Sequence, residues 1–172
     1  IYEIPLVLNK QEFDEAVVTR LNMDANGSHE NLHILENSIH RYKNPDDTVT
    51  IAICGKYNSL QDAYKSILEA FIHAGIENTT QVKVKWVDTE KLEKCNDINK
   101  EFAGIDGLLI PGGFGDRGIE GKIRASKYAR ENNIPFFGIC LGLQCAIIDF
   151  ARNVCKMASA NSTEFDKKCK YP

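Results

Sequence analysis

The alternation of apolar and polar positions predicts strands and helices in turn from Thr48 onward. Four short apolar runs with strand-like composition occupy residues 48–54, 81–87, 105–110 and 134–139. The run at 81–87 alternates apolar residues with lysine, which indicates a strand with one exposed face near an edge of the sheet. The other three runs are largely apolar on both faces, as in parallel strands covered by helices. This order predicts a doubly wound, mainly parallel α/β sheet with helices on both faces.

Amphipathic stretches between these runs predict the helices. The first is capped by Ser59 and stops at Gly75, and two more cover residues 119–132 and 141–154. Residues 92–102 form a less certain helical stretch. In such a fold, chemistry gathers at the carboxyl ends of the strands, where two glycine-rich turns stand in this sequence.

The first 47 residues have a weaker pattern. They begin with an extended stretch, and a short amphipathic helix follows with Phe13, Val17 and Leu21 on one stripe. The next residues are polar, include a possible helix at 28–42, and are interpreted as a connector. The expected organisation is a tail at 1–22, a linker at 23–47 and an α/β domain at 48–172.

Composition narrows the choice of function. The 172 residues are 43% hydrophobic and 26% charged, with a net charge of −3, which is typical of a soluble globular protein. The sequence has no basic patch of the kind that binds nucleic acid, and no apolar run is long enough for a membrane span. The six cysteines have no C-x-x-C or Cys/His metal-ligand spacing, so we expect no metal site. Reduced thiols and the lack of a secretory signal lead us to expect a cytoplasmic protein.

A cysteine between two glycines stands where the last predicted strand meets the last helix. The sequence from Gly138 to Gly142 is G-x-C-x-G, the thiol form of the nucleophile elbow. In such a turn the nucleophile has a strained backbone, and glycine at both ends avoids a steric clash. The positive end of the following helix favours a thiolate. Cys140 is therefore the candidate nucleophile, although a free cysteine is often simply a buried apolar residue.

A second glycine-rich turn, Pro111–Gly118, follows the preceding strand. It matches neither the phosphate-binding G-x-x-x-x-G-K-[ST] pattern nor G-x-G-x-x-G. If the two strands are neighbours, the N–H groups of Gly113 and Leu141 would form an oxyanion hole for acyl transfer at Cys140. The alternative is a flexible surface turn.

Other polar residues are weaker candidates. Gln144 lies one turn into the helix after Cys140 and could contact a substrate amide, and Glu164 could hold a substrate ammonium. A cysteine nucleophile usually needs a histidine as general base. Three of the four histidines lie in the connector and the fourth in the first helix, so none is assigned: His29, His33, His40 and His73.

Five separated motifs resemble the class I (triad) glutamine amidotransferases, and among them the CTP synthase family. The motifs are Gly55–Tyr57 with Asp62–Ser66, Pro111–Gly115, Arg117–Ile123, Ile139–Gln144 and Ala160–Phe165. The resemblance runs from about residue 48 to residue 166, and residues 1–21 resemble the tail of that family's synthetase domain.

The resemblance implies a function. Glutamine would be hydrolysed through a cysteinyl thioester, and the ammonia would pass to the synthetase domain of the same polypeptide, which aminates UTP to CTP with ATP and magnesium. It implies pyrimidine biosynthesis by a homo-oligomeric enzyme activated by GTP, and no cofactor within this chain. By position, Cys140 is the nucleophile and Gly113 and Leu141 supply the oxyanion donors. The glutamine site is lined by Gly142, Leu143, Gln144 and Glu164, and Phe114 and Arg117 lie on a lid linked to GTP activation.

The sequence also departs from the family pattern. The family has its triad His and Glu downstream of the position of Glu164, and neither is found before Pro172. We therefore expect a fragment whose domain is incomplete and which is inactive alone. Leu143 replaces the more usual Met, a volume-conserving change. The alternatives are a non-catalytic regulatory or assembly module of the same fold, or another class I amidotransferase.

Overall fold

The computed structural model of the chain describes residues 1–24, 30–56 and 61–172. It divides into two compact units, one formed by residues 1–48 and 68–81 and the other by residues 49–67 and 82–172. The helix cap expected at Ser59, Tyr57 of the first motif and the start of the helix expected at residue 28 lie outside the described residues.

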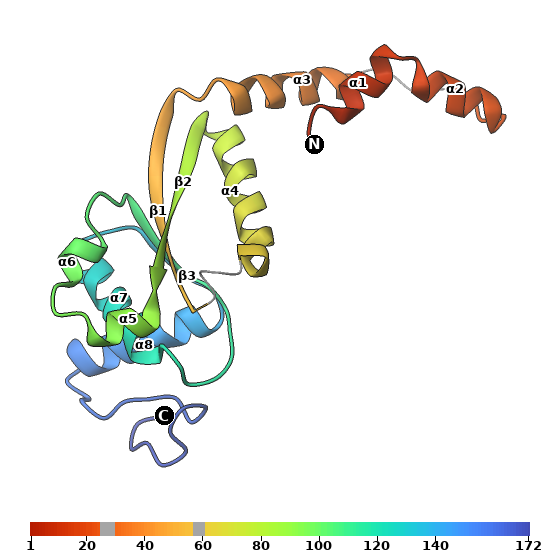
Figure 1. Cartoon of the computed structure of the whole chain (residues 1–172). Helices are drawn as coiled ribbons and strands as arrows, with labels where there is room; N and C mark the ends of the chain where they lie inside the picture. The colour runs from red at the N-terminus through yellow and green to blue at the C-terminus, as the bar shows by residue number, and fades with distance from the viewer. Residues whose placement is uncertain (25–29, 57–60) are drawn as a thin grey trace. The chain divides into compact units, whose positions relative to one another are not determined.

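Four parallel strands form the central sheet in the order β2-β1-β3-β4 (Figure 1). They are β1 (Asp47–Gly55), β2 (Thr80–Asp88), β3 (Gly107–Ile110) and β4 (Phe136–Gly138). β1 pairs in parallel with β3, and β3 with β4. Directly before β1 and β2, the Asp46 N–H donates to the Thr79 carbonyl at 2.7 Å, so these two strands start together and run the same way. The predicted parallel α/β fold is confirmed.

The two edge strands differ from the buried centre of the sheet. All four residues of β3 are buried, as its apolar sequence predicts. The lysines of β2 alternate with apolar residues because β2 is at an edge. β4 is shorter than the predicted run at 134–139, and its central residue Phe137 is 63% exposed rather than buried, because β4 forms the other edge.

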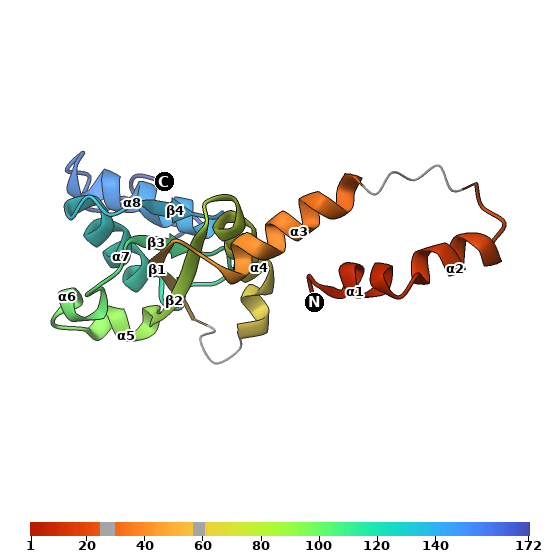
Figure 2. The ribbon, with the colours of Figure 1, turned by 90° about the horizontal axis from the view of Figure 1, so that it is seen from above.

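Four helices flank this sheet in the second unit. They are α5 (Thr89–Lys94), α6 (Ile98–Glu101), α7 (Ile119–Glu131) and α8 (Leu141–Asn153). α7 and α8 lie side by side, and both contact β3 and β4 (Figures 1 and 2). An apolar cluster joins these two helices and consists of Ile119, Ile123, Leu141, Cys145 and Ile148, with Phe165 packed against it. Because Ile119 and Leu141 begin their helices, this cluster fixes the two turns that precede them.

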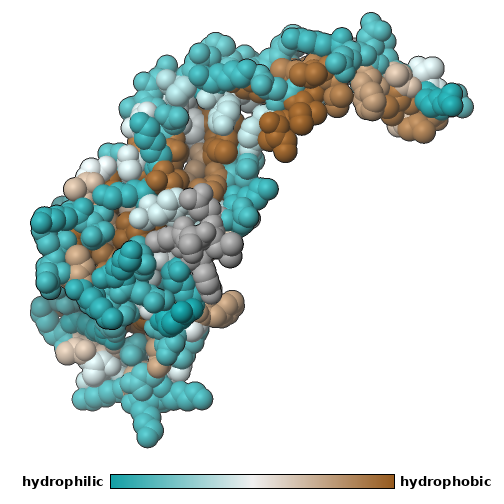
Figure 3. Space-filling model, in the orientation of Figure 1, coloured by the Kyte–Doolittle hydropathy of each residue, from teal (hydrophilic) through white to brown (hydrophobic). Residues whose placement is uncertain are grey.

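The first unit is helical and corrects one expectation. The start of the chain is not extended but forms α1 (Ile4–Lys10), because Pro5 in the first turn is compatible with a helix start. α2 (Phe13–Arg20) and α3 (Glu30–Lys43) follow, and α2 contains no buried residue. Apolar side chains of these helices are consequently exposed, and in α2 they include Phe13 and Val17. Figure 3 shows apolar surface on this unit.

The helix after β1 also differs from its prediction. Tyr64 lies in a short 3-10 turn (Gln61–Tyr64), and α4 (Lys65–Glu77) starts only after it. Gly75 does not end α4 but is buried inside it. Glycine lowers helix stability without forbidding a helix, so tertiary packing decides such a position.

Candidate active site

Cys140 occupies the turn between β4 and α8 in a rarely adopted backbone conformation. Its φ is +51° and its ψ is −103°, and the residue is exposed. A Cβ atom at Gly138 would lie 2.5 Å from the Gly142 carbonyl carbon, and one at Gly142 would lie 2.2 Å from the Ile110 oxygen. Close backbone contacts on both sides therefore require both glycines of the G-x-C-x-G sequence, and they hold the strained residue in place.

The second glycine turn lies beside this elbow. The Ile139 N–H donates to the Ile110 carbonyl at 2.9 Å, which joins the ends of β3 and β4. A Cβ built on Gly112 would lie 3.7 Å from the Cβ of Cys140, at van der Waals distance. The sequence-based expectation that the two turns meet at one end of the sheet agrees with this geometry.

The two candidate oxyanion donors are neighbours in the structure. A Cβ on Gly113 would lie 3.6 Å from Cδ2 of Leu141, which is the first residue of α8. In the described part of the chain, neither the Gly113 N–H nor the Leu141 N–H has a hydrogen-bond acceptor. The Leu141 N–H is at a helix start, where such groups commonly bind anions, and the Gly113 N–H lies in a glycine turn, so both groups are available to stabilise negative charge.

Gln144 and Leu143 extend the site along α8. The Gln144 N–H donates to the Cys140 carbonyl at 3.2 Å, while its side-chain Oε1 is buried and has no partner among the described residues. An unsatisfied buried amide oxygen is costly, and a ligand donor would relieve it. Leu143 is 54% exposed, and Gly142 is buried beneath it.

Glu164 lies in the exposed loop after α8. Its N–H donates to Ser162 Oγ at 3.2 Å, and the next residue, Phe165, packs on the apolar cluster that includes Leu141. The loop is thus fixed to the same cluster as the start of α8. The exposed carboxylate of Glu164 can contact solvent or a ligand.

Burial separates Cys140 from two other thiols of this unit. Cys54 and Cys145 are fully buried, and this burial raises the pKa of both. The pKa of Cys145 rises to about 11, so its thiol stays neutral and unreactive at physiological pH. Cys140 is exposed five residues earlier, at the start of the helix.

The segment that contains Phe114 and Arg117 has two anchors that the sequence reasoning missed. Lys56 Nζ, directly after β1, donates to the Phe114 carbonyl at 2.6 Å, and Arg117 faces Glu90 of α5 at 3.7 Å. Phe114 itself is 82% exposed. The position of Lys56 just after a buried strand was a usable signal, whereas nothing in the sequence indicates Glu90.

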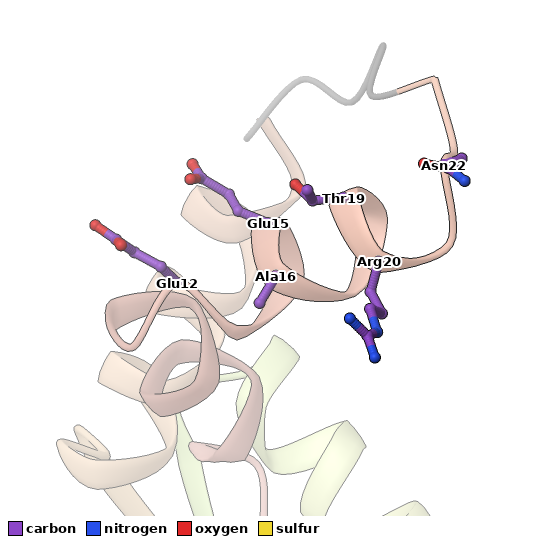
Figure 4. A pocket seen from close by; sticks show the side chains of 6 residues that line it. All are labelled: Glu12, Glu15, Ala16, Thr19, Arg20 and Asn22. Carbon is purple, nitrogen blue, oxygen red and sulfur yellow. The ribbon is translucent and has the colours of Figure 1, made fainter.

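Two other hollows lie on helical surfaces. One, on α2, is lined by side chains that point in different directions (Figure 4): Glu12, Glu15, Ala16, Thr19, Arg20 and Asn22. The other lies on α8 and is apolar, with Ile147 and Phe150 among its lining residues. Within residues 1–24, 30–56 and 61–172, no group of three or more His, Cys, Asp or Glu side chains is placed to hold a metal. Over the same residues, no helix combines the length and apolarity that a bilayer span requires.

Comparisons with known proteins identify the family to which the chain belongs. Residues 59–170 match the sequence model of the family described as glutamine amidotransferase class-I. The whole chain is 53% identical to 31% of the CTP synthase of Chlorobaculum tepidum and 51% identical to 32% of that of Methanocaldococcus jannaschii. The chain thus spans about a third of the length of the curated relatives it matches. A solved structure described as a Trypanosoma brucei CTPS glutaminase domain with bound acivicin is 43% identical and covers 72% of this chain and 48% of its own, with a TM-score of 0.67.

Proposed function

The chain belongs to the class I glutamine amidotransferase family, and from this premise we propose that Cys140 hydrolyses glutamine through a cysteinyl thioester. The family expected from the sequence, and the resemblance to the amidotransferase domain of CTP synthases, are confirmed by the matches above. The observation that supports the proposal most directly is the backbone of Cys140, strained between two glycines beside a second glycine turn.

The proposed reaction follows from this arrangement. The Cys140 thiolate attacks the side-chain amide carbon of glutamine, and the negative charge that develops on the oxygen is stabilised by the N–H groups of Gly113 and Leu141. The C–N bond then breaks, a general acid protonates the nitrogen, and ammonia leaves a glutamyl thioester on Cys140. Water hydrolyses that thioester to glutamate and regenerates the thiol.

The substrate contacts are also proposals. The Glu164 carboxylate would pair with the α-ammonium of glutamine, and the unsatisfied Oε1 of Gln144 would accept a hydrogen bond from a substrate N–H. Gly142 and Leu143 would line the same site. Gly142 leaves no room for a side chain, whereas Leu143 offers exposed apolar surface.

The wider role rests on the relatives, which are CTP synthases. We propose that the ammonia serves a synthetase domain of the same polypeptide, which aminates UTP to CTP with ATP and magnesium in the cytoplasm as a homo-oligomer. Those cofactors belong to that other domain, so no step above involves them. Phe114 and Arg117 would belong to a lid that responds to GTP.

The general base is the part of the triad that this unit does not supply. The four histidines are residues 29, 33, 40 and 73, and none falls within residues 49–67 or 82–172 of the unit that contains Cys140. We propose that the base comes from outside this unit, and we expect the 172-residue chain alone to turn over glutamine slowly. The same observation favours a second candidate function, a non-catalytic regulatory or assembly module.

Mutation of the nucleophile distinguishes the two functions. In a polypeptide that contains this segment together with a synthetase domain, Cys140→Ser should abolish glutamine-dependent CTP formation and leave ammonia-dependent formation intact. Removal of such a nucleophile typically costs several orders of magnitude in rate. Cys155→Ser, a change at another exposed cysteine, is the control and should affect neither activity. Loss of both activities with Cys140→Ser, or loss of neither, contradicts the proposal.

A further inference from the structure

One arginine near the end of α8 joins two segments that contain candidate site residues. Arg152 Nε donates to the Ala160 carbonyl at 2.7 Å, and its Nη1 donates to both carboxylate oxygens of Glu120, at 3.0 and 2.9 Å. The Arg152 side chain is only 20% exposed, so these bonds are partly shielded from water. Arg152 has no assigned role in the glutaminase reaction proposed above.

The first bonded segment is the base of the proposed lid. Glu120 lies in the first turn of α7, three residues after Arg117. It is adjacent to Ile119, which is buried in the cluster shared with Leu141 of α8. The guanidinium therefore holds the carboxylate at the point where the lid segment becomes helix.

The second bonded segment leads directly to Glu164. Ala160 is 4% exposed, and a continuous series of local hydrogen bonds follows it. Asn161 Oδ1 accepts from the Ser162 N–H at 2.9 Å, and Ser162 in turn accepts from the Glu164 N–H at its Oγ (3.2 Å) and from the Phe165 N–H at its carbonyl (3.0 Å). A displacement of Ala160 is thus transmitted to the Glu164 backbone.

We propose that Arg152 is a positioning residue that fixes Glu164 relative to the base of the lid and thereby sets the affinity for the substrate ammonium. The inference rests on the proposed glutaminase function. Arginine is required because its planar fork bonds the carbonyl and the carboxylate at once. A lysine in its place offers one compact ammonium that cannot span both partners.

The test uses covalent labelling of Cys140 in the full 172-residue chain with two electrophiles. A chloroketone analogue of glutamine keeps the α-ammonium and α-carboxylate, whereas iodoacetamide has neither. The variants are Arg152→Lys, Arg152→Met and Glu120→Gln, the last of which keeps the bond to Ala160. The matched control is Arg124→Lys, because Arg124 of α7 also donates to backbone carbonyls, but to those of Leu92 in α5 and Cys95 directly after α5.

The expected result is a change in binding rather than in reactivity. Arg152→Lys and Arg152→Met should raise the inhibition constant of the chloroketone about tenfold, with little change in its limiting rate or in the iodoacetamide rate. Glu120→Gln should raise it less, and Arg124→Lys should leave it unchanged. Hydrogen–deuterium exchange over residues 158–166 should increase in both Arg152 variants but not in Arg124→Lys.

Different outcomes would contradict the positioning role of Arg152 and the proposed glutaminase function. An unchanged inhibition constant in the Arg152 variants, or an equal rise with Arg124→Lys, overturns the positioning role. Unchanged exchange over residues 158–166 overturns it whether or not glutamine is the substrate. A wild-type chain that reacts with the chloroketone without saturation and no faster than with iodoacetamide contradicts the proposed function instead. If an Arg152 variant does not fold, the Glu120→Gln variant decides the question. An unchanged inhibition constant of the chloroketone in that variant refutes the proposal.

Discussion

At the scale of single residues, the strained backbone of Cys140 depends on what surrounds it. A residue with φ of +51° persists only when its neighbours leave no better choice. Here the carbonyl of Ile110 approaches Gly142 so closely that a methyl group cannot be inserted between them. The close approach of β3 to the start of α8 is therefore a condition for the elbow.

This contact predicts a large effect for one methyl group. Gly142→Ala would place a Cβ 2.2 Å from the Ile110 oxygen and should lower the free energy of unfolding by about 2–3 kcal/mol. Gly112→Ala is the matched control, because its Cβ would meet nothing closer than 3.7 Å. Urea unfolding of the two variants measures the difference, and equal losses would show that the contact does not constrain the elbow.

The buried thiol of Cys145 predicts a dependence of stability on pH. Burial raises its pKa from 9.0 to about 11, so the folded state holds the proton that the unfolded state releases. The protonated thiol therefore contributes about 2–3 kcal/mol to the free energy of unfolding below pH 9, and this contribution is lost as the pH rises toward 11.

The matching measurement compares wild type with Cys145→Ala by urea unfolding between pH 8 and pH 11, a range that starts below the pKa of the unfolded state and reaches that of the folded state. The variant should be less stable at pH 8 because a cavity forms, yet its stability should fall less steeply with pH. Parallel curves would mean that Cys145 ionises equally easily in both states.

At the scale of elements, the pairing of α7 with α8 includes a buried acid. Asp149 is 1% exposed and accepts two bonds from Arg130, from Nε at 2.8 Å and from Nη2 at 3.2 Å, and one from Asn153 at 2.8 Å. The Asp149 side chain raises the pKa of Arg130, chiefly through these hydrogen bonds. Removal of the arginine would leave a buried carboxylate with one partner.

Arg130→Met should therefore destabilise the chain by about 2 kcal/mol or more, since unpaired buried charge is costly. Lys127→Met removes an exposed ion pair of the same helix, at 3.9 Å from Glu131, and should change stability by less than about 0.5 kcal/mol. Thermal or urea unfolding of both variants is the measurement. A similar small change in both would indicate that water reaches Asp149.

Comparison of the predicted and observed helices and strands shows which features the sequence alone could predict. Apolar runs predicted β1, β3 and β4, and alternation of apolar residues with lysine predicted the edge strand β2, because the burial of a strand leaves a direct trace in its composition. The elbow was predictable as well, since G-x-C-x-G is a short local pattern in the sequence, although the contact that requires Gly142 comes from Ile110 of β3. The first helix was not predicted from the sequence, although Pro5 in its first turn is compatible with a helix start, and the continuation of α4 through Gly75 depends on packing. The bonds from Lys56 to Phe114 and from Arg152 to Glu120 join segments far apart in sequence, so no local pattern shows which partner either side chain binds.

At the scale of the whole molecule, the chain spans about a third of the length of its curated relatives. The unit that contains Cys140 has no histidine in its sequence. If Cys140 is the nucleophile, as proposed, it can react once with an electrophile that resembles glutamine even where turnover is slow. The chain therefore allows binding and nucleophilic attack to be tested apart from turnover.

The most direct measurement is labelling of the 172-residue chain by a glutamine-derived chloroketone, followed by mass spectrometry of the six cysteine-containing positions. The account predicts saturable labelling of Cys140 that glutamine prevents, while the buried Cys54 and Cys145 stay unmodified. Labelling that is spread over the exposed cysteines, or that glutamine does not slow, would contradict it.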